Sequence, residues 1–323
     1  MNASLKNAVQ IFAQTSGLGR LARAATRRQL RILCYHGIWI TPGTKFSNCN
    51  FIEPEQFERR MERLKRSGQP VLGLDEAIER LEHDDLPDAA VVITIDDGWV
   101  STLTHMLPVL EALDLPATLY ATTWYSDNRL PVINVAVDYL RTASGRLDLD
   151  TDALAAEIEA LPLDQRREAL RDLGKRLGIG EDWLDLRQFE LMAPAELAEV
   201  KRRGLDVQLH THRHIDVSRY YAQLPAEIEE NRRSLQAALG TGTIDHFCYP
   251  SGSFAAQAPE LLARSGVRSA TLTAAGLNAP GCNLLTLKRF LDCRDVTDAT
   301  FDAYLSGFHH WMSAARPGER TCQ

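Results

Sequence analysis

The chain has 323 residues, of which 45% are hydrophobic and 24% charged, so it has ample apolar material for a large globular core. Its net charge of -7 argues against a nucleic-acid partner, because a nucleic-acid-binding domain usually carries a basic surface. The sequence contains neither an apolar run that would span a membrane nor the apolar core of a secretory signal, which predicts a cytoplasmic location.

Residues 1–28 form a predicted N-terminal helical segment with a strong positive charge. No acidic residue precedes Glu53, and five arginines lie between residues 20 and 31. One interpretation is a helix that makes peripheral contact with an anionic membrane surface. The interpretation that we favour is a terminal helix packed on the fold, because a run of charges is usually a solvated face.

Strand-like and helical runs alternate through residues 29–323, which we expect to form one domain. Strands are expected at 30–38, 91–95, 116–123, 205–209, 244–250, 267–273 and 284–290, and helices at 51–68, 75–84, 101–115, 194–204 and 225–239. Ser101 is the expected N-cap of its helix and Pro108 the expected kink. Residues 125–190 differ from this alternation and are predicted to be a helical insertion within the same domain.

The alternation predicts an α/β fold built from parallel strand–helix–strand units. About seven such units in a chain of this length favour a closed (β/α) barrel over two domains. In such barrels the chemical groups gather at the C-terminal ends of the strands. His36, Asp96, Asp97 and His210 each follow an apolar strand-like run, so we treat them as parts of one site.

Asp96 and Asp97 are adjacent carboxylates at the end of the apolar run 91–95. Successive residues of a strand face opposite ways, so the two can share a site only if the chain turns there. Gly98 provides the conformational freedom for such a turn. A bound cation would neutralise one carboxylate and spare the pair from protonation.

The segment "LHTHRH" supplies three histidines as candidate ligands. If it continues as a strand, His210, His212 and His214 share a face, whereas a helical turn would bring only His210 and His214 together. Neutral imidazoles with a carboxylate make a three-ligand set that leaves positions open for water, which is typical of a catalytic metal site.

Scattered cysteines and aromatic residues complete the candidate features. The six cysteines contain no C-x-x-C pair, and their scatter favours reduced thiols over a disulfide framework. Trp99, Trp124 and Tyr125 follow predicted strands and could stack on a sugar ring, although each alone fits rim packing equally well.

Two motifs in this order resemble the polysaccharide deacetylase family, the NodB-homology carbohydrate esterases of family 4 type. "TIDDGW" resembles the family's T-F-D-D-G signature, and "HTHRH" matches its H-[ST]-x-x-H motif. "CYHGI" and "FERRMERLKRSG" resemble the subgroup that has an early Y-H strand and a following F-x-x-x-L-x-x-L-x-x-x-G helix. The resemblance runs from about residue 30 to about residue 290 and leaves out the helical insertion.

The resemblance implies a distorted (β/α) barrel that hydrolyses N-acetyl groups on sugars. Asp97, His210 and His214 match the metal ligands, and Asp96 matches the base that takes a proton from metal-bound water. Ligand type predicts zinc, although iron, cobalt, nickel and manganese accept the same ligands.

The sequence departs from the family pattern at its third motif, which commonly reads R-P-P-Y. The corresponding stretch here is "FCYPSG", with Cys248 in place of the arginine and Ser251 in place of the tyrosine. The backbone N–H of Ser251 is still a candidate oxyanion donor, because that role needs no particular side chain. Arg289 in "LKRF", just after a predicted strand, is the candidate that orients Asp96.

The late histidine motif that usually supplies the general acid is also not evident. In the early Y-H subgroup a histidine near the N-terminus takes that role, and the resemblance therefore implies His36. His309 and His310 are the less favoured candidates, because they lie in a helix-like tail.

The leading functional hypothesis is a metal-dependent N-deacetylase that acts on a polysaccharide or glycolipid precursor of envelope or exopolysaccharide synthesis. A deformylase or another small-amide hydrolase could use the same site. A catalytically inactive relative that only binds saccharide is the alternative from a different class, and the missing motif arginine motivates it.

Overall fold

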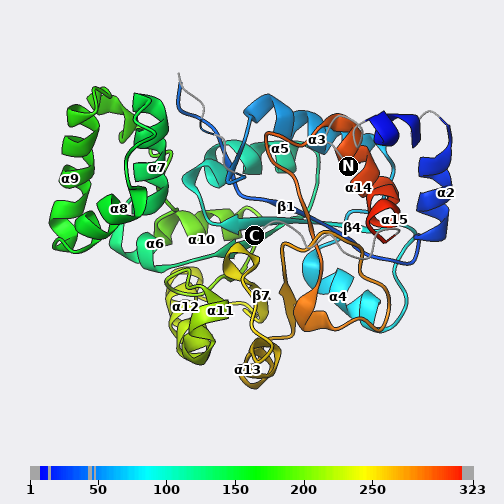
Figure 1. The fold of residues 1–323 in the computed structure, drawn as a ribbon. Helices are drawn as coiled ribbons and strands as arrows, with labels where there is room; N and C mark the ends of the chain where they lie inside the picture. The colour runs from blue at the N-terminus through cyan, green and yellow to red at the C-terminus, as the bar shows by residue number, and fades with distance from the viewer. Residues whose placement is uncertain (1–7, 14–15, 43–45, 47–48, 315–323) are drawn as a thin grey trace.

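The computed structural model describes residues 8–13, 16–42, 46 and 49–314, and its centre is a curled sheet of seven parallel strands (Figure 1). The order across the sheet is β8-β7-β6-β5-β4-β1-β9. The strands are β1 (Arg31–Tyr35), β4 (Val91–Asp97), β5 (Thr118–Ala121), β6 (Asp206–Leu209), β7 (His246–Cys248), β8 (Ser269–Thr271) and β9 (Phe290–Leu291). A parallel bridge from Thr271 to Leu287 joins β8 to the segment that leads into β9. The two ends of the sheet therefore approach each other, and the predicted distorted (β/α) barrel is confirmed.

The strand predicted at 30–38 is divided in two. β1 ends at Tyr35, and β2 (Gly37–Ile38) pairs with β3 (Phe51–Ile52) in a small parallel sheet of its own. His36 lies at the junction, at the C-terminal end of β1. The break thus places His36 at the rim of the barrel, where the other strand ends also lie.

Helices connect the strands of the barrel. They are α3 (Pro54–Arg66), α4 (Leu74–Glu82), α5 (Leu107–Ala112), α10 (Pro194–Arg202), α11 (Val217–Tyr220), α12 (Leu224–Leu239) and α13 (Ala258–Arg264), and single 3₁₀ turns lie at 181–183, 221–223, 250–252 and 284–286. The predicted Ser101 cap is wrong, because the Ser101 hydroxyl oxygen instead accepts the Ile38 N–H at 2.9 Å. A π-helical stretch, Thr102–Met106, precedes α5, whose second residue is Pro108.

Four further helices lie between β5 and α10: α6 (Trp124–Asn128), α7 (Ile133–Ser144), α8 (Thr151–Glu159) and α9 (Leu163–Arg176). α7, α8 and α9 form a group at the left of Figure 1, on the opposite side of the molecule from α2 (Leu18–Ala25). Their apolar side chains form one buried cluster with Trp39 and Phe51, which belong to the β2–β3 region, and with Trp99, which follows β4. The helical region is thus packed directly on the rim where β1 and β4 end.

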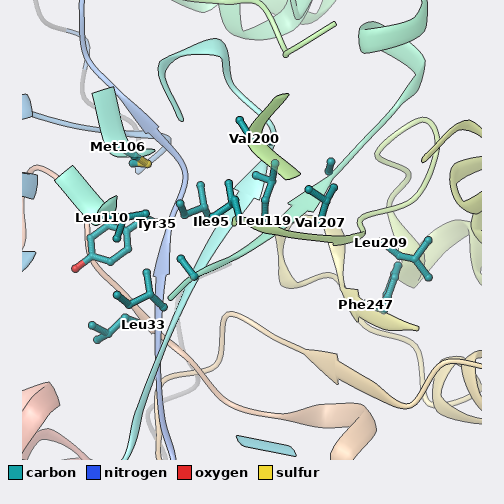
Figure 2. Close-up of a cluster of buried hydrophobic side chains, with 14 of the residues drawn as sticks. Leu33, Tyr35, Ile95, Met106, Leu110, Leu119, Val200, Val207, Leu209 and Phe247 are labelled. Carbon is teal, nitrogen blue, oxygen red and sulfur yellow. The ribbon is translucent and has the colours of Figure 1, made fainter. Parts of the chain in front are cut away.

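The two faces of the sheet carry different side chains because successive strand residues alternate. Figure 2 shows one face, where Leu33, Ile95 and Leu119 pack with Met106 and Val200 from the surrounding helical segments. The other face holds a second buried cluster, which includes Ile32, Val92 and Tyr120 from the strands. Thr94 and Asp96 have the same parity as Val92, so they point to this second face, the inside of the barrel.

The described part of the N-terminal segment packs on the C-terminal helices. Residues 8–13 are helical, and Ala22 of α2 lies in one buried cluster with Ala303 of α14 (Asp298–Ser306) and Phe308 of α15 (Phe308–Ala314). Phe12 and Leu21 are exposed. Among the described helices, none has the length and apolar character needed to cross a membrane.

Candidate metal centre and active site

The turn that separates the two adjacent carboxylates begins at Asp97 itself. Asp97 has a φ of 72° and Gly98 a φ of 101°, so the chain leaves the extended conformation one residue earlier than the glycine predicts. Thr211, His214 and Ser251 also have positive φ, at 62°, 55° and 54°. Such conformations are costly for residues other than glycine and tend to cluster at functional sites.

Asp97, His210 and His214 converge at the C-terminal ends of β4 and β6. Asp97 Oδ1 lies 3.2 Å from His210 Nε2 and 3.5 Å from His214 Nε2. One ligand atom of each residue lies within 4.8 Å of the other two. A carboxylate oxygen and two imidazole nitrogens at these separations fit a single divalent cation and leave coordination positions open.

Hydrogen bonds behind this triad fix the orientation of its members. His210 Nδ1 lies 2.8 Å from the carbonyl oxygen of Cys248, which can only accept, so Nδ1 donates to it and Nε2 is the nitrogen that faces Asp97 and would hold a metal ion. Trp99 Nε1 donates to the other oxygen of Asp97, Oδ2, at 2.8 Å. Asn231 on α12 accepts the His210 backbone N–H at 2.9 Å. These contacts hold Asp97 and His210 in a buried setting, whereas the His214 side chain is 34% exposed.

His212 points away from the triad. Its Nδ1 is 2.8 Å from the hydroxyl oxygen of Thr123, and its Nε2 is 3.8 Å from Glu230. The carbonyl oxygen of His212 also accepts the Trp124 N–H. Of the two conformations considered for "HTHRH", a strand and a turn, the segment therefore adopts the turn, which brings its first and last histidines to the same side.

Asp96 is held from inside the barrel by Arg289. The guanidinium donates to Asp96 Oδ1 at 2.7 Å and to Oδ2 at 2.6 Å, and both side chains are almost fully buried. It also donates to the hydroxyl of Thr94 and to the carbonyl of Leu272, each at 3.0 Å. The sequence suggested that Arg289 follows a strand, whereas in the structure it immediately precedes β9. Cys248, at the position of the family arginine, donates from its thiol to Asp96 Oδ2 at 3.3 Å.

The two carboxylates are charged for different reasons. Burial by itself would raise the pKa of Asp96, but the charge and hydrogen bonds of Arg289 lower it to about 2. Burial also acts to raise the pKa of Asp97, and the hydrogen bonds of His210 and His214 bring it well below the usual value. Each carboxylate thus has its own source of positive charge, and the like-charge pair can remain ionised.

His36 faces Asp96 from the end of β1. Its Nε2 lies 3.8 Å from Asp96 Oδ2, which is longer than a hydrogen bond, and its side chain is only 14% exposed. Burial lowers the pKa of His36 more than the neighbouring carboxylates raise it, so the imidazole is neutral at pH 7. A neutral ring beside a carboxylate can accept a proton from it and donate a proton elsewhere.

A cavity of about 850 Å³ opens over these groups. Ser251 lies in its wall, as do Trp99 and Tyr125, whereas Trp124 stacks against Arg166. The cavity lining comprises His36, Cys49, Asn50, Asp97, Trp99, Thr122, Tyr125, Val132, Asn134, Val135, Asp152, Ala155, Ala156, Glu159, Leu191, Arg213, His214, Ser251, Thr273 and Leu291. One wall belongs to α8, so the helical region borders the space above the triad.

The late histidines are not brought to the triad. His309 packs against the rings of Phe290 and Tyr304, with ring centroids 5.8 Å and 5.0 Å away. Neither His309 nor His310 is among the residues that line the cavity. Of the histidines considered as general acids, His36 is the one that lies beside Asp96.

Several residues of the site carry no recognisable signal in the sequence. Asn231 holds His210 from a helix 21 residues further along the chain, and the thiol of Cys34 donates to Asp96 Oδ2 at 3.5 Å from a neighbouring strand. The wall formed by α8 is likewise invisible in the sequence motifs. Trp99 lies two residues after Asp97, and this proximity could have suggested that its indole N–H bonds to the carboxylate. A tryptophan at this position is, however, equally consistent with simple packing.

Comparisons with known proteins relate the chain to one family and its fold to several solved structures. A family model described as polysaccharide deacetylase matches residues 83–270, more than half of the chain. The deacetylase PplD from Streptococcus pyogenes, solved in complex with acetate, superposes with a TM-score of 0.59 at 18% identity, over 87% of this chain and 99% of that one. IcaB from Ammonifex degensii gives 0.58 at 20% identity, over 86% and 97% of the two chains. A de-N-acetylase from Aggregatibacter actinomycetemcomitans gives 0.59 at 15% identity, over 85% and 99%. No curated protein is significantly similar to the chain in sequence.

Proposed function

This chain belongs to the polysaccharide deacetylase family of amide-bond hydrolases, and we propose that it is a metal-dependent enzyme that removes N-acetyl groups from a sugar of a polysaccharide. The observation that supports the proposal is that two adjacent carboxylates have different partners. Asp97 faces two imidazole nitrogens, whereas both oxygens of Asp96 accept hydrogen bonds from the guanidinium of Arg289. One carboxylate is thus arranged to hold a cation, and its neighbour is left to handle a proton.

The residues present fit a divalent metal ion, which Asp97, His210 and His214 would hold. When bound there, the ion would acidify a water molecule and polarise the acetyl carbonyl, so that a base as weak as Asp96 suffices. We propose zinc on ligand type, and iron, cobalt, nickel and manganese suit the same donors.

Asp96 is the proposed general base. Because it is ionised, it can take the proton of a water molecule whose oxygen bonds to the acetyl carbon. Arg289 fixes both oxygens of Asp96 and so sets the direction in which the carboxylate accepts. The thiols of Cys34 and Cys248 also donate to Oδ2, whereas Oδ1 accepts from Arg289 alone among the described residues.

His36 is the proposed general acid, and Ser251 the proposed oxyanion donor. The neutral imidazole of His36 receives the proton through Asp96 and delivers it to the sugar nitrogen as the carbon–nitrogen bond breaks. The products are then a free amine and acetic acid, which releases its remaining proton to water and becomes acetate, and both groups return to their starting charge. The Ser251 backbone N–H, in the left-handed turn of the cavity wall, would stabilise the negative charge that develops on the carbonyl oxygen.

Metal analysis combined with an acetate-release assay tests the proposal. The wild-type protein should contain about one metal ion per chain and release acetate from N-acetylglucosamine oligomers. Asp96→Asn should keep the metal and lose at least about a hundredfold in rate, in the range of general-base removal. Asp206→Asn is a matched control, because Asp206 begins β6 at the opposite end of the barrel and contacts Lys201. A metal-free protein that binds glycans without releasing acetate would contradict the proposal.

A further inference from the structure

Two cysteines meet at the rim of the active-site cavity. The sulfur atoms of Cys49 and Cys293 are 2.9 Å apart, although the residues are separated by 244 positions in the sequence. A disulfide bond has a sulfur–sulfur length of about 2.05 Å, so the two atoms need to approach by less than about 1 Å. We propose that Cys49 and Cys293 are a modification site whose thiols form a disulfide bond. This inference goes beyond the proposed function and does not depend on it.

The two thiols differ in a way that suits stepwise oxidation. Cys49 is exposed, whereas Cys293 is buried. The hydrogen bond that the Cys293 thiol donates lowers the pKa of Cys49 to about 7, despite the opposing effect of burial. The same contact, together with burial, raises the pKa of Cys293. Cys49 is therefore the accessible thiolate, and Cys293 is the second thiol that resolves the reaction.

A low-molecular-weight disulfide such as glutathione disulfide supplies the oxidant. The Cys49 thiolate attacks one sulfur of the reagent, forms a mixed disulfide and releases one glutathione thiolate. Cys293 then loses its proton and attacks the Cys49 sulfur, which expels the second glutathione. The protein loses two electrons and two protons, and one glutathione disulfide becomes two glutathione molecules.

Backbone hydrogen bonds anchor both sides of the pair, and on the Cys49 side they reach the segment that carries His36. The carbonyl oxygen of Cys293 accepts hydrogen bonds from Gln56 Nε2 at 3.3 Å and from the Val296 N–H at 3.0 Å. On the other side, Asn50 accepts the Gly37 N–H at 2.8 Å, and Gly37 follows the candidate acid His36. A bond between the sulfurs would therefore link the end of β9 to the segment that carries His36.

The other described cysteines do not offer a comparable pair. Cys34 and Cys248 are buried inside the barrel around Asp96, where an oxidant from solvent has no access. Cys282 is a partly exposed free cysteine, and among the described residues no second cysteine sulfur is in contact with its sulfur. Cys282→Ser is therefore a matched control. The proposal therefore concerns one pair.

Oxidation of the full-length protein with glutathione disulfide tests the inference. After alkylation of the remaining thiols, the wild type should lose two hydrogen atoms by mass and yield a cross-linked peptide that contains Cys49 and Cys293. Its melting temperature should rise by roughly 5 °C over the dithiothreitol-reduced form, because the bond closes a long loop. Cys49→Ser and Cys293→Ala should abolish both changes, and Cys282→Ser should keep them.

A persistent glutathione adduct on Cys49 without the cross-link would overturn the inference, and so would a cross-link from Cys49 to another cysteine. These readouts use the wild-type chain, so they stand even if Cys293→Ala does not fold. They also need no enzymatic activity. A chain that forms the cross-link but releases no acetate in its reduced form would refute the proposed function alone, and an active chain that forms no cross-link would refute this inference alone.

Discussion

Arg289→Lys should separate the orientation of Asp96 from the neutralisation of its charge. Lysine keeps a positive charge in the barrel interior but cannot reproduce the two parallel bonds of 2.7 Å and 2.6 Å to the carboxylate. A hydrogen bond to a charged group contributes about 2 kcal/mol, and each 1.4 kcal/mol is about tenfold in rate. If the lost hydrogen bond stabilises the transition state by this amount, kcat should fall about 30-fold. Arg289→Met should destabilise the fold by about 4 kcal/mol, because it leaves a buried carboxylate unpaired.

Acetate release and urea unfolding, measured on the same preparations, distinguish a catalytic effect from loss of folded protein. Arg31→Lys is the matched control, since Arg31 is also fully buried but donates to the carbonyls of Thr26, Gln29 and Leu305 at the opposite end of β1. The control should lose stability and keep its kcat. Metal content should be unchanged in both variants. Wild-type kcat in Arg289→Lys, or a loss no larger than in the control, would refute the positioning argument.

Three further outcomes follow from the geometry. His210→Ala should lose bound metal while His212→Ala retains it, because His210 faces Asp97 and His212 does not; equal metal loss by elemental analysis would contradict the ligand assignment. His36→Ala should keep the metal and lose about a hundredfold or more in kcat, and intact turnover would exclude His36 as the acid. Burial raises the pKa of Asp292 to about 6 from 3.8, so the folded state binds its proton more tightly and stability falls as pH rises from about 4 to 6. Urea titrations should show this fall, up to about 3 kcal/mol, reduced in Asp292→Asn; equal pH slopes would contradict it.

Much of the fold was predictable because its signals are local. The apolar runs at 91–95 and 205–209 are strands β4 and β6, and the segments that begin with Pro54 and Pro194 are helices as predicted. The rule that polar groups gather at strand ends placed Asp97 and His210 on one rim before their distance was known. In each case a short stretch of sequence carries the whole signal.

The parts that were not predictable depend on contacts between distant segments. The predicted strand at 30–38 breaks at His36 because Gly37 and Ile38 pair with residues 51–52, and this pairing has no mark in either stretch. Asn231 lies in an ordinary amphipathic helix, so nothing in its neighbourhood indicates that it supports a metal ligand. The contact between Cys49 and Cys293 spans most of the chain, which is why the spacing of the cysteines suggested only scattered thiols.

Asp96 has a buried cationic partner, Arg289, although the stretch that resembles the family's third motif has Cys248 in place of an arginine. In a closed barrel, side chains from different strands converge on the same interior point, so a cation that neutralises Asp96 need not come from a particular strand. Here Cys248 on β7 is too short and uncharged, and Arg289 reaches the carboxylate from the segment before β9. The thiol of Cys248 lies 3.0 Å from that guanidinium, so a second long side chain at this position would have to displace the first. Cysteine at 248 and arginine at 289 are therefore two halves of one arrangement, and the altered motif does not by itself indicate a loss of catalysis.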